Sequence, residues 1–264
     1  MPEQGTSSGS QLLAELTRDE AGRRVPDATV ILPTAAIEQH GPHLPIVTDT
    51  YIVEAVATRA AALASAPVLV APTLCYGASQ HHFPFPGVLS LSSATFGGAV
   101  RDLLASLARW GARRVYILNG HGGNDELIRL IAREEAPLLN LAIGAASYWS
   151  LAWEGLLALD AHYLVGPLPG HAGGFETSLM LALRPDLVHP ERRLRSREPF
   201  AVSTWPHGSR GTVALPRGDD PGPGTSDDAQ KATAQWGERL FEAIVREVAA
   251  ALDTFHQDTG RLVR

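Results

Sequence analysis

The stretch Arg114-Val115-Tyr116-Ile117-Leu118-Asn119-Gly120-His121-Gly122-Gly123-Asn124-Asp125-Glu126 decides the fold. Its first part, residues 114–118, is a short apolar run of the kind that forms a strand buried on both faces. The glycines that follow predict a loop. Asn124 with two acids after it predicts a helix start, because a cap and early negative charge complement the helix dipole. A strand, a tight loop and a helix in this order are typical of α/β proteins with parallel strands.

Other parts of the chain repeat this pattern. Short apolar runs predict further strands at residues 28–33, 68–71 and 141–146. Helical spacing and composition predict helices at residues 10–24, 50–64, 95–110, 176–183 and 229–255. The alternation predicts a single α/β domain with a mostly parallel central sheet flanked by helices on both faces. We expect a flexible N-terminus over residues 1–10 and one domain over residues 11–264, a length that can bury a large core.

Composition narrows the class of protein. The net charge of −6 and the absence of a basic stripe argue against a nucleic-acid partner and against an anionic membrane surface. The apolar run 60–71 is too short to span a bilayer and contains Pro67. Residues 1–10 lack the regions of a signal peptide, so we expect a cytoplasmic location. Cys75 is the single cysteine, which excludes an intrachain disulfide and leaves only nitrogen and oxygen ligands for a metal.

Potential metal ligands gather after the predicted strands. Glu38-Gln39-His40-Gly41-Pro42-His43-Leu44-Pro45 and Thr48-Asp49-Thr50 hold carboxylates and imidazoles in a stretch rich in glycine and proline. Glu38 and His40 are two residues apart, so in an extended segment both side chains point to the same side. This stretch and His121 each follow a predicted strand closely, at the sheet edge where α/β proteins bind ligands. Such loops suit a divalent metal ion and predict a metal-dependent hydrolase.

Together these motifs resemble the creatininase family, also called the creatinine amidohydrolases. The resemblance covers roughly residues 28–245 and is carried by residues 38–50, 85–87, 119–124, 171–178 and 228–233. It implies an α/β fold and hydrolysis of non-peptide or unusual amide C–N bonds. It also implies homo-oligomers, often hexamers, and two divalent metal ions per chain, of zinc or manganese type with iron also compatible.

The resemblance also implies roles for individual residues. The metal ligands would be Glu38, His40, Asp49, His121 and Glu176. Asp49 would bridge the two ions, and a hydroxide held between them would attack the amide carbonyl. His171 would be the general acid and base that protonates the leaving nitrogen, since histidine titrates near neutral pH.

Plainer roles stay open at several positions. Asp49 could be an ordinary helix cap, and Glu176 an acid that only complements a helix dipole. His171 could support a ligand or bind substrate. His81 and His82 could contact substrate or pack in their loop, and Trp149 could line a pocket or fill the core.

Some positions depart from the resemblance. Creatininase proper has a glutamate where this chain has Gly123, so we assign the last ligand to Glu176. It also has a Trp-Asp pair where this chain has Pro167-Leu168-Pro169, which argues against creatinine as the substrate. The branch that matures the mycofactocin precursor has charged residues around its His-Ala-Gly motif, where this chain has Gly170 and Gly174-Phe175.

These departures leave several functions to compare. We expect a small-molecule amide as substrate: a lactam, a formamide or another non-standard C–N bond. The alternatives are a peptidase that matures a modified peptide of the mycofactocin type, and a metal-binding oligomeric scaffold without catalysis. The Pro/Gly-rich loop 216–228 is expected to act as a lid or an oligomer contact.

Overall fold

A computed structural model describes residues 10–194 and 222–260 of the chain. Within these residues, four parallel strands form one sheet in the order β2-β1-β3-β4. The strands are β1 (Thr29–Thr34), β2 (Val68–Val70), β3 (Arg114–Asn119) and β4 (Ala142–Ser147). β1 pairs with β3 from Thr29↔Arg114 to Thr34↔Asn119. The carboxyl ends of β1, β3 and β4 therefore lie side by side at one edge of the sheet.

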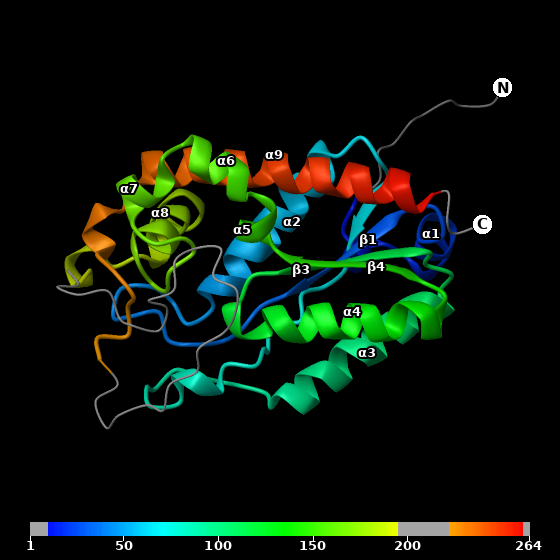
Figure 1. The fold of residues 1–264 in the computed structure, drawn as a ribbon, viewed down its shortest axis with the longest axis horizontal. Helices are drawn as coiled ribbons and strands as arrows, with labels where there is room; N and C mark the ends of the chain where they lie inside the picture. Colours follow the sequence, from blue (N-terminus) through cyan, green and yellow to red (C-terminus); the bar gives the residue numbers. More distant parts are fainter. Residues whose placement is uncertain (1–9, 195–221, 261–264) are drawn as a thin grey trace.

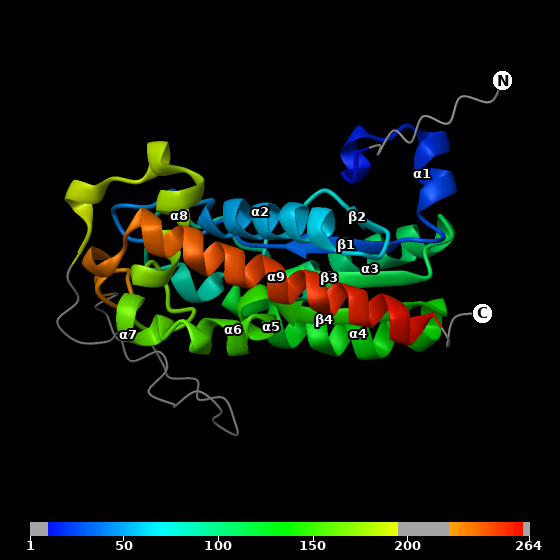
Figure 2. The same ribbon diagram turned by 90° about the horizontal axis from the view of Figure 1, so that it is seen from above.

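Helices cover both faces of the sheet (Figure 1). Over one face lie α2 (Thr48–Leu63) and α9 (Ala234–Thr259), which run beside each other in the view from above (Figure 2). Over the other face lie α3 (Ser93–Arg109) and α4 (Asp125–Leu139). Helix α8 (Gly174–Leu183) packs against α2 and α9 beyond the carboxyl ends of the strands.

The remaining helical segments are short. The α-helices among them are α1 (Arg18–Arg24), α5 (Tyr148–Leu151), α6 (Trp153–Ala158) and α7 (Ala161–Val165). The 3-10 turns are Leu13–Glu15, Gln80–His82, Gly122–Asn124, Pro185–Leu187, Pro190–Arg192 and Ala229–Lys231.

Side chains of the central strands alternate between two hydrophobic clusters. On β1, Ile31 faces the cluster under α2 and α9, whereas Val30 and Leu32 face the cluster under α3 and α4. On β3, Leu118 and Ile117 divide in the same way. Because both faces are buried, these strands read as continuous apolar runs, which is why the sequence predicts them.

The predicted fold class is confirmed, although some elements differ from the sequence prediction. The helix expected over residues 10–24 is divided, because Thr17 starts a new helix there through a capping box with Glu20. The last helix also starts later than expected, at the Thr233 cap, whose hydroxyl accepts a hydrogen bond from the Trp236 N–H. The short helices at residues 148–165 were not predicted, although the buried Tyr148, Ala152 and Leu156 recur at a helical spacing of four residues.

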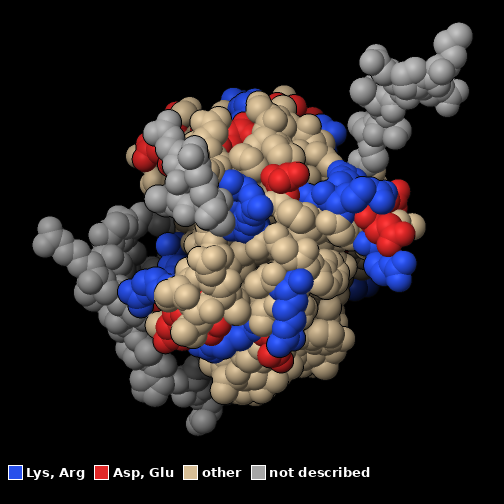
Figure 3. Space-filling model, turned by 90° about the vertical axis from the view of Figure 1, so that its right-hand side faces the viewer, with Lys and Arg blue, Asp and Glu red and all other residues tan. Residues whose placement is uncertain are grey.

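Two expectations fall partly outside the described residues. Residues 1–9 of the expected flexible N-terminus and residues 216–221 of the expected lid are among those not described. Figure 3 shows the end of the molecule that carries α1, where basic and acidic side chains lie among uncharged ones. In the part of the chain that the structure describes, no helix has both the length and the apolar character needed to cross a membrane.

Candidate metal centre

The loop between β1 and α2 carries Glu38 and His40. The Glu38 N–H donates to the Ile46 carbonyl at 3.0 Å, which closes the loop on itself. The chain reverses at Gly41, where φ is +63° and an added Cβ would lie 2.7 Å from the Thr225 Cγ2 atom. Only glycine fits this turn without strain. The side chains that this loop carries are both buried: Glu38 is 2% exposed and His40 is 0% exposed.

Asp49 lies in the first turn of α2, between two imidazoles. Its Oδ1 is 3.1 Å from His40 Nε2, and its Oδ2 is 3.2 Å from His121 Nδ1. The N-cap of α2 is Val47, and no side chain caps this helix end. An ordinary capping role for Asp49 is therefore wrong, and its carboxylate is directed into the cluster.

His121 follows β3 on a loop that the buried side chain of Asn119 shapes. The Asn119 Oδ1 accepts from the His121 N–H at 3.1 Å, and its amide nitrogen donates to the His121 carbonyl at 2.6 Å. The imidazole Nε2–H donates to the Ala78 carbonyl at 3.3 Å, since a carbonyl can only accept. In the neutral imidazole the lone pair is then on Nδ1, which lies 3.3 Å from Glu38 Oε1.

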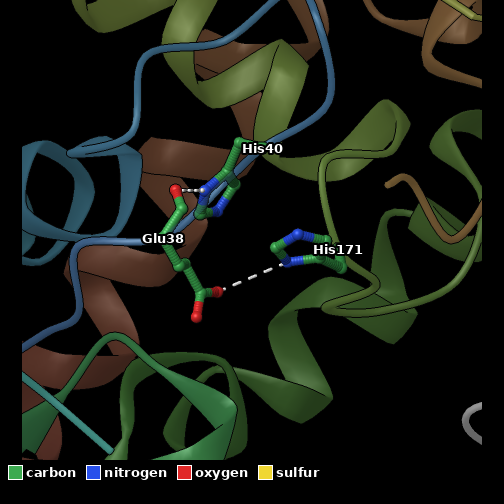
Figure 4. A group of neighbouring side chains, drawn as sticks. All are labelled: Glu38, His40 and His171. Carbon is green, nitrogen blue, oxygen red and sulfur yellow. Dashed lines mark hydrogen bonds and ion pairs between the residues drawn. The ribbon is translucent and has the colours of Figure 1, made fainter. Parts of the chain in front are cut away.

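A backbone carbonyl orients His40 in the same way. Its Nδ1–H donates to the Glu38 carbonyl at 3.1 Å (Figure 4). In the neutral imidazole the lone pair is therefore on Nε2, which faces Asp49 and lies 3.6 Å from Glu176 Oε2 in α8. A histidine that ligates a metal commonly has its other nitrogen fixed by such a hydrogen bond.

The ligands form two groups that share Asp49. The first group is His40, Asp49 and Glu176, whose ligand atoms lie within 4.8 Å of one another. The second group is Glu38, Asp49 and His121, in which His121 Nδ1 lies within 3.3 Å of an oxygen of each carboxylate. Among the described residues, His40 Nε2 and Asp49 Oδ2 are buried and make no hydrogen bond. Buried polar atoms rarely lack partners. Here His40 Nε2 faces Asp49 Oδ1, and Asp49 Oδ2 faces His121 Nδ1. The two groups therefore fit two cations.

Electrostatics in the metal-free cluster support this conclusion. Burial disfavours the charged imidazole of His121, but the carboxylates of Glu38 and Asp49 together outweigh this effect and raise the His121 pKa to about 10. For His40, burial is likewise outweighed, by Asp49 and then Glu176, and the pKa lies well above its usual value. Protons thus occupy the cluster when metal is absent. Cations that bind there must displace them.

His171 lies on the loop before α8 and faces the second group. Its Nδ1 is 3.5 Å from Glu38 Oε1, and its ring centroid is 4.5 Å from that of His40 (Figure 4). Its Nε2 lies 2.8 Å from the Gln39 carbonyl and 2.9 Å from the Gln39 side-chain nitrogen. Nε2 can therefore donate a hydrogen bond to the Gln39 carbonyl or accept one from the Gln39 side-chain nitrogen. Burial and then the neighbouring His40 lower the His171 pKa well below its usual value.

The His171 loop is fastened by residues that sequence reasoning missed. The Ser226 hydroxyl accepts from the His171 N–H at 2.6 Å and donates to Asp227 Oδ2 at 2.8 Å. The other Asp227 oxygen accepts from the Gly174 N–H at 2.9 Å. Ser79, whose hydroxyl donates to Glu38, was also missed. Nothing local in the sequence marks these residues, because each contacts a segment far away along the chain.

The remaining candidates lie at different distances from the cluster. His82 is buried, with its Nε2 3.6 Å from Glu38 Oε1 and its ring stacked on His171. His81 is exposed, and its ring stacks on His121 with centroids 5.4 Å apart. Trp149 packs against the core beside Tyr148. Substrate binding by these three residues stays a prediction.

The sequence and the fold are similar to those of known proteins. The family model described as creatinine amidohydrolase matches residues 14–252. This chain belongs to the creatininase family. It is 36% identical to a creatinine amidohydrolase of Pseudomonas putida, over 93% of this chain and 97% of that protein. It is 32% identical to a mycofactocin precursor peptide peptidase of Mycolicibacterium smegmatis, over 89% of this chain and 88% of that protein.

Solved structures of the creatininase family have the same fold. The structure named Creatininase Mn has a TM-score of 0.76 and 34% identity, and covers 92% of this chain and 97% of its own. A mutant creatininase of Zn-Zn type has a TM-score of 0.76 and 35% identity, with the same coverage. The predicted family and fold are thereby confirmed.

Proposed function

We propose that the protein is a metal-dependent amidohydrolase that cleaves a non-standard C–N amide bond. Two divalent ions would be held by the first and second groups, with Asp49 shared between them. The observation that carries this proposal is the Asp49 carboxylate, which presents one oxygen to His40 and the other to His121. Solved relatives of Mn and Zn-Zn type support manganese or zinc as the metal, and mixed nitrogen and oxygen ligands are also compatible with iron.

The bound ions would polarise an amide carbonyl and lower the pKa of water. The protein's own contribution to proton transfer would come from His171. With its low pKa this imidazole is neutral near pH 7 and can accept a proton. In the charged form, Nδ1–H faces Glu38 and Nε2–H faces the Gln39 carbonyl, so both hydrogens have an acceptor. His171 can therefore hold a proton briefly and pass it to the leaving nitrogen.

The substrate class follows from relatives and from this chain's own residues. The family includes a creatinine amidohydrolase, which supports a small amide as substrate. The segment 167–169 lacks the Trp-Asp pair of creatininase proper, so we propose a lactam or formamide in place of creatinine.

A peptidase acting on a modified peptide is the second candidate. It is favoured by the similarity to mycofactocin precursor peptide peptidases, which extends over most of the chain. A panel of lactams, formamides and short peptides, assayed with zinc and with manganese, separates the candidates. Turnover of peptides alone would replace the first proposal by the second.

Metal content of the purified protein tests the proposal directly. We expect about two divalent ions per chain by plasma mass spectrometry, because the two groups supply ligands for two ions. Asp49→Ala removes the shared carboxylate and should lose both. Glu54→Ala, which changes an exposed acid on the same helix, should keep both. An apoprotein that takes up neither zinc nor manganese would refute the metal centre and the proposed hydrolase with it.

Catalysis by His171 has a separate test. His171→Ala should retain both ions and lower turnover by about two orders of magnitude or more, the contribution typical of a general acid or base. Unchanged turnover would assign proton transfer to another group.

Assembly and location are further parts of the proposal. Ile46, Phe83 and Leu89 are exposed apolar residues on loops beside the centre, and they support a contact between subunits of a homo-oligomer, for which we propose a hexamer. Light scattering of the purified protein would give the mass of the assembly and so the number of subunits. We also propose a cytoplasmic location, which the free thiol of Cys75 suits, and cell fractionation tests it.

A further inference from the structure

We propose that His81 is a ligand of the second group, in addition to Glu38, Asp49 and His121. This role rests on the proposed binuclear centre and gives it one more ligand. One ligand atom each from Glu38, His81 and His121 lie within 4.8 Å of one another. Two ligands on one ion, each about 2.0–2.2 Å from it, stand at most about 4.4 Å apart. The three ligand atoms are therefore already close to the spacing that one ion requires.

The turn that carries His81 is fastened next to the second group. His81 is the middle residue of the 3-10 turn Gln80–His82. Immediately before the turn, the Ser79 hydroxyl donates to Glu38, and the Ser79 N–H donates to the Ser90 hydroxyl at 2.7 Å. The Ala78 N–H donates to Asn124 at 2.9 Å. This anchoring places the His81 ring over His121 although the side chain is exposed.

Gly123 leaves room for the His81 ring. A Cβ added at position 123 would lie 2.6 Å from His121 Nε2 and 2.9 Å from His81 Cε1. Both separations are shorter than van der Waals contact, so a side chain at position 123 would compete with the imidazole for this space. The glycine cannot supply a ligand itself, and His81 is the residue beside it that can.

The neighbouring His82 is excluded as this ligand by its hydrogen bonds. The Gln39 side-chain oxygen accepts from the Gly41 N–H at 2.9 Å. This bond fixes the orientation of the amide group, so the atom that faces the histidines is its nitrogen. That nitrogen donates to His82 Nδ1 at 3.1 Å. The proton of neutral His82 is then on Nε2, which faces Glu38. His82 therefore presents a hydrogen to the second group and no lone pair.

Addition of His81 makes the two groups unequal. The first group has one nitrogen and two oxygen donors, all from buried side chains. The second group, with His81, has two nitrogen and two oxygen donors, one of them on an exposed residue. Imidazole favours zinc over manganese. The ion in the second group should be the more zinc-selective and, because one ligand is open to solvent, the faster to exchange.

Metal binding to His81→Ala tests this role without an assay of turnover. The apoprotein is titrated with Co²⁺, and visible absorption and plasma mass spectrometry report the ions bound. We expect the first ion to bind as in the wild type and the second to bind at least about tenfold more weakly, in keeping with losses seen when a metal's supporting residues are removed. Gln80→Ala, an exposed neighbour on the same turn, is the matched control and should bind both ions normally.

The outcomes distinguish this role from the binuclear centre. Weakened second-site binding in His81→Ala, restored in His81→Glu, supports His81 as a ligand. Unchanged binding of both ions in His81→Ala overturns that role and leaves the binuclear centre intact. A wild-type protein that binds no Co²⁺ overturns the centre itself. Circular dichroism of the variants excludes loss of fold as the cause, and His81 is exposed, so its removal leaves no core cavity.

Discussion

Replacing Asp227 by alanine should loosen the loop that carries His171. The Asp227 side chain is 7% exposed and accepts two hydrogen bonds, from the Gly174 N–H and from the Ser226 hydroxyl. Ser226 in turn exchanges two hydrogen bonds with the His171 backbone, accepting at its hydroxyl and donating from its N–H at 2.8 Å. Without the carboxylate, the buried Gly174 N–H loses the acceptor that it has in the structure.

The size of the effect can be worked out from these contacts. Hydrogen bonds to a charged acceptor contribute about 1.5–3 kcal/mol each. Part of this is offset, because burial raises the Asp227 pKa and the ionised carboxylate is itself costly to bury. We therefore expect Asp227→Ala to lower the free energy of unfolding by about 2–4 kcal/mol. For a chain of this size, the melting temperature should fall by roughly 5–15 °C.

Thermal unfolding and hydrogen exchange together measure this effect. Exchange should accelerate most in residues 170–178, because the Gly174 amide loses its acceptor. Asp227→Asn keeps an acceptor for Gly174 and should lose less than half as much stability. Asp228→Asn is the matched control, since asparagine also caps the following turn, where Asp228 accepts from the Gln230 N–H. Exchange and melting of Asp227→Ala like those of the wild type would refute the anchoring role of Asp227.

Two other predictions follow from the centre and from the packing around it. In the metal-free protein the His121 pKa is raised to about 10, so protonation of His121 stabilises the folded state. This stabilisation is complete at a pH below the unfolded pKa of about 6.5 and is lost as the pH rises toward 10. The melting temperature of the chelated protein should therefore decrease as pH rises from about 7 to 10, and a flat profile would contradict this. Gly120→Ala would place a Cβ 2.8 Å from Val53 Cβ and 3.1 Å from the Asp49 carbonyl, and should cost about 1–3 kcal/mol and weaken metal binding. Gly22→Ala, with nothing within 4 Å, should instead stabilise the exposed helix α1 slightly, and similar unfolding curves for the two variants would be evidence against the close packing.

The sheet could be predicted from the sequence because its strands are local apolar runs. Residues 114–118 and 28–33 read as strands without knowledge of their neighbours, and burial on both faces explains why. The amphipathic period is weaker around residues 10–24, and there a single capping residue, Thr17, decided where the helix begins. The short helices at residues 148–165 were missed although Tyr148, Ala152 and Leu156 recur at helical spacing.

The candidate ligands were predictable for a different reason. Their residue types and their places after strands pointed to one sheet edge, and the structure brings them together there. The supporting residues were not predictable. Ser79 contacts Glu38, and Asp227 contacts Gly174, across separations that no local pattern encodes. The position of His81 over His121 likewise depends on how two distant loops meet.

The end of the sheet opposite the ligand groups is held by hydrogen bonds to α9. At the amino ends of the strands, the Thr29 hydroxyl is 2.9 Å from His256 Nδ1, and the Arg114 guanidinium donates to the Thr259 hydroxyl at 3.1 Å. Both bonds tie α9 to the end of the molecule remote from the ligand groups (Figure 1). Efforts to improve heat resistance for practical use can therefore concentrate on this remote end, where substitutions leave the chemistry untouched.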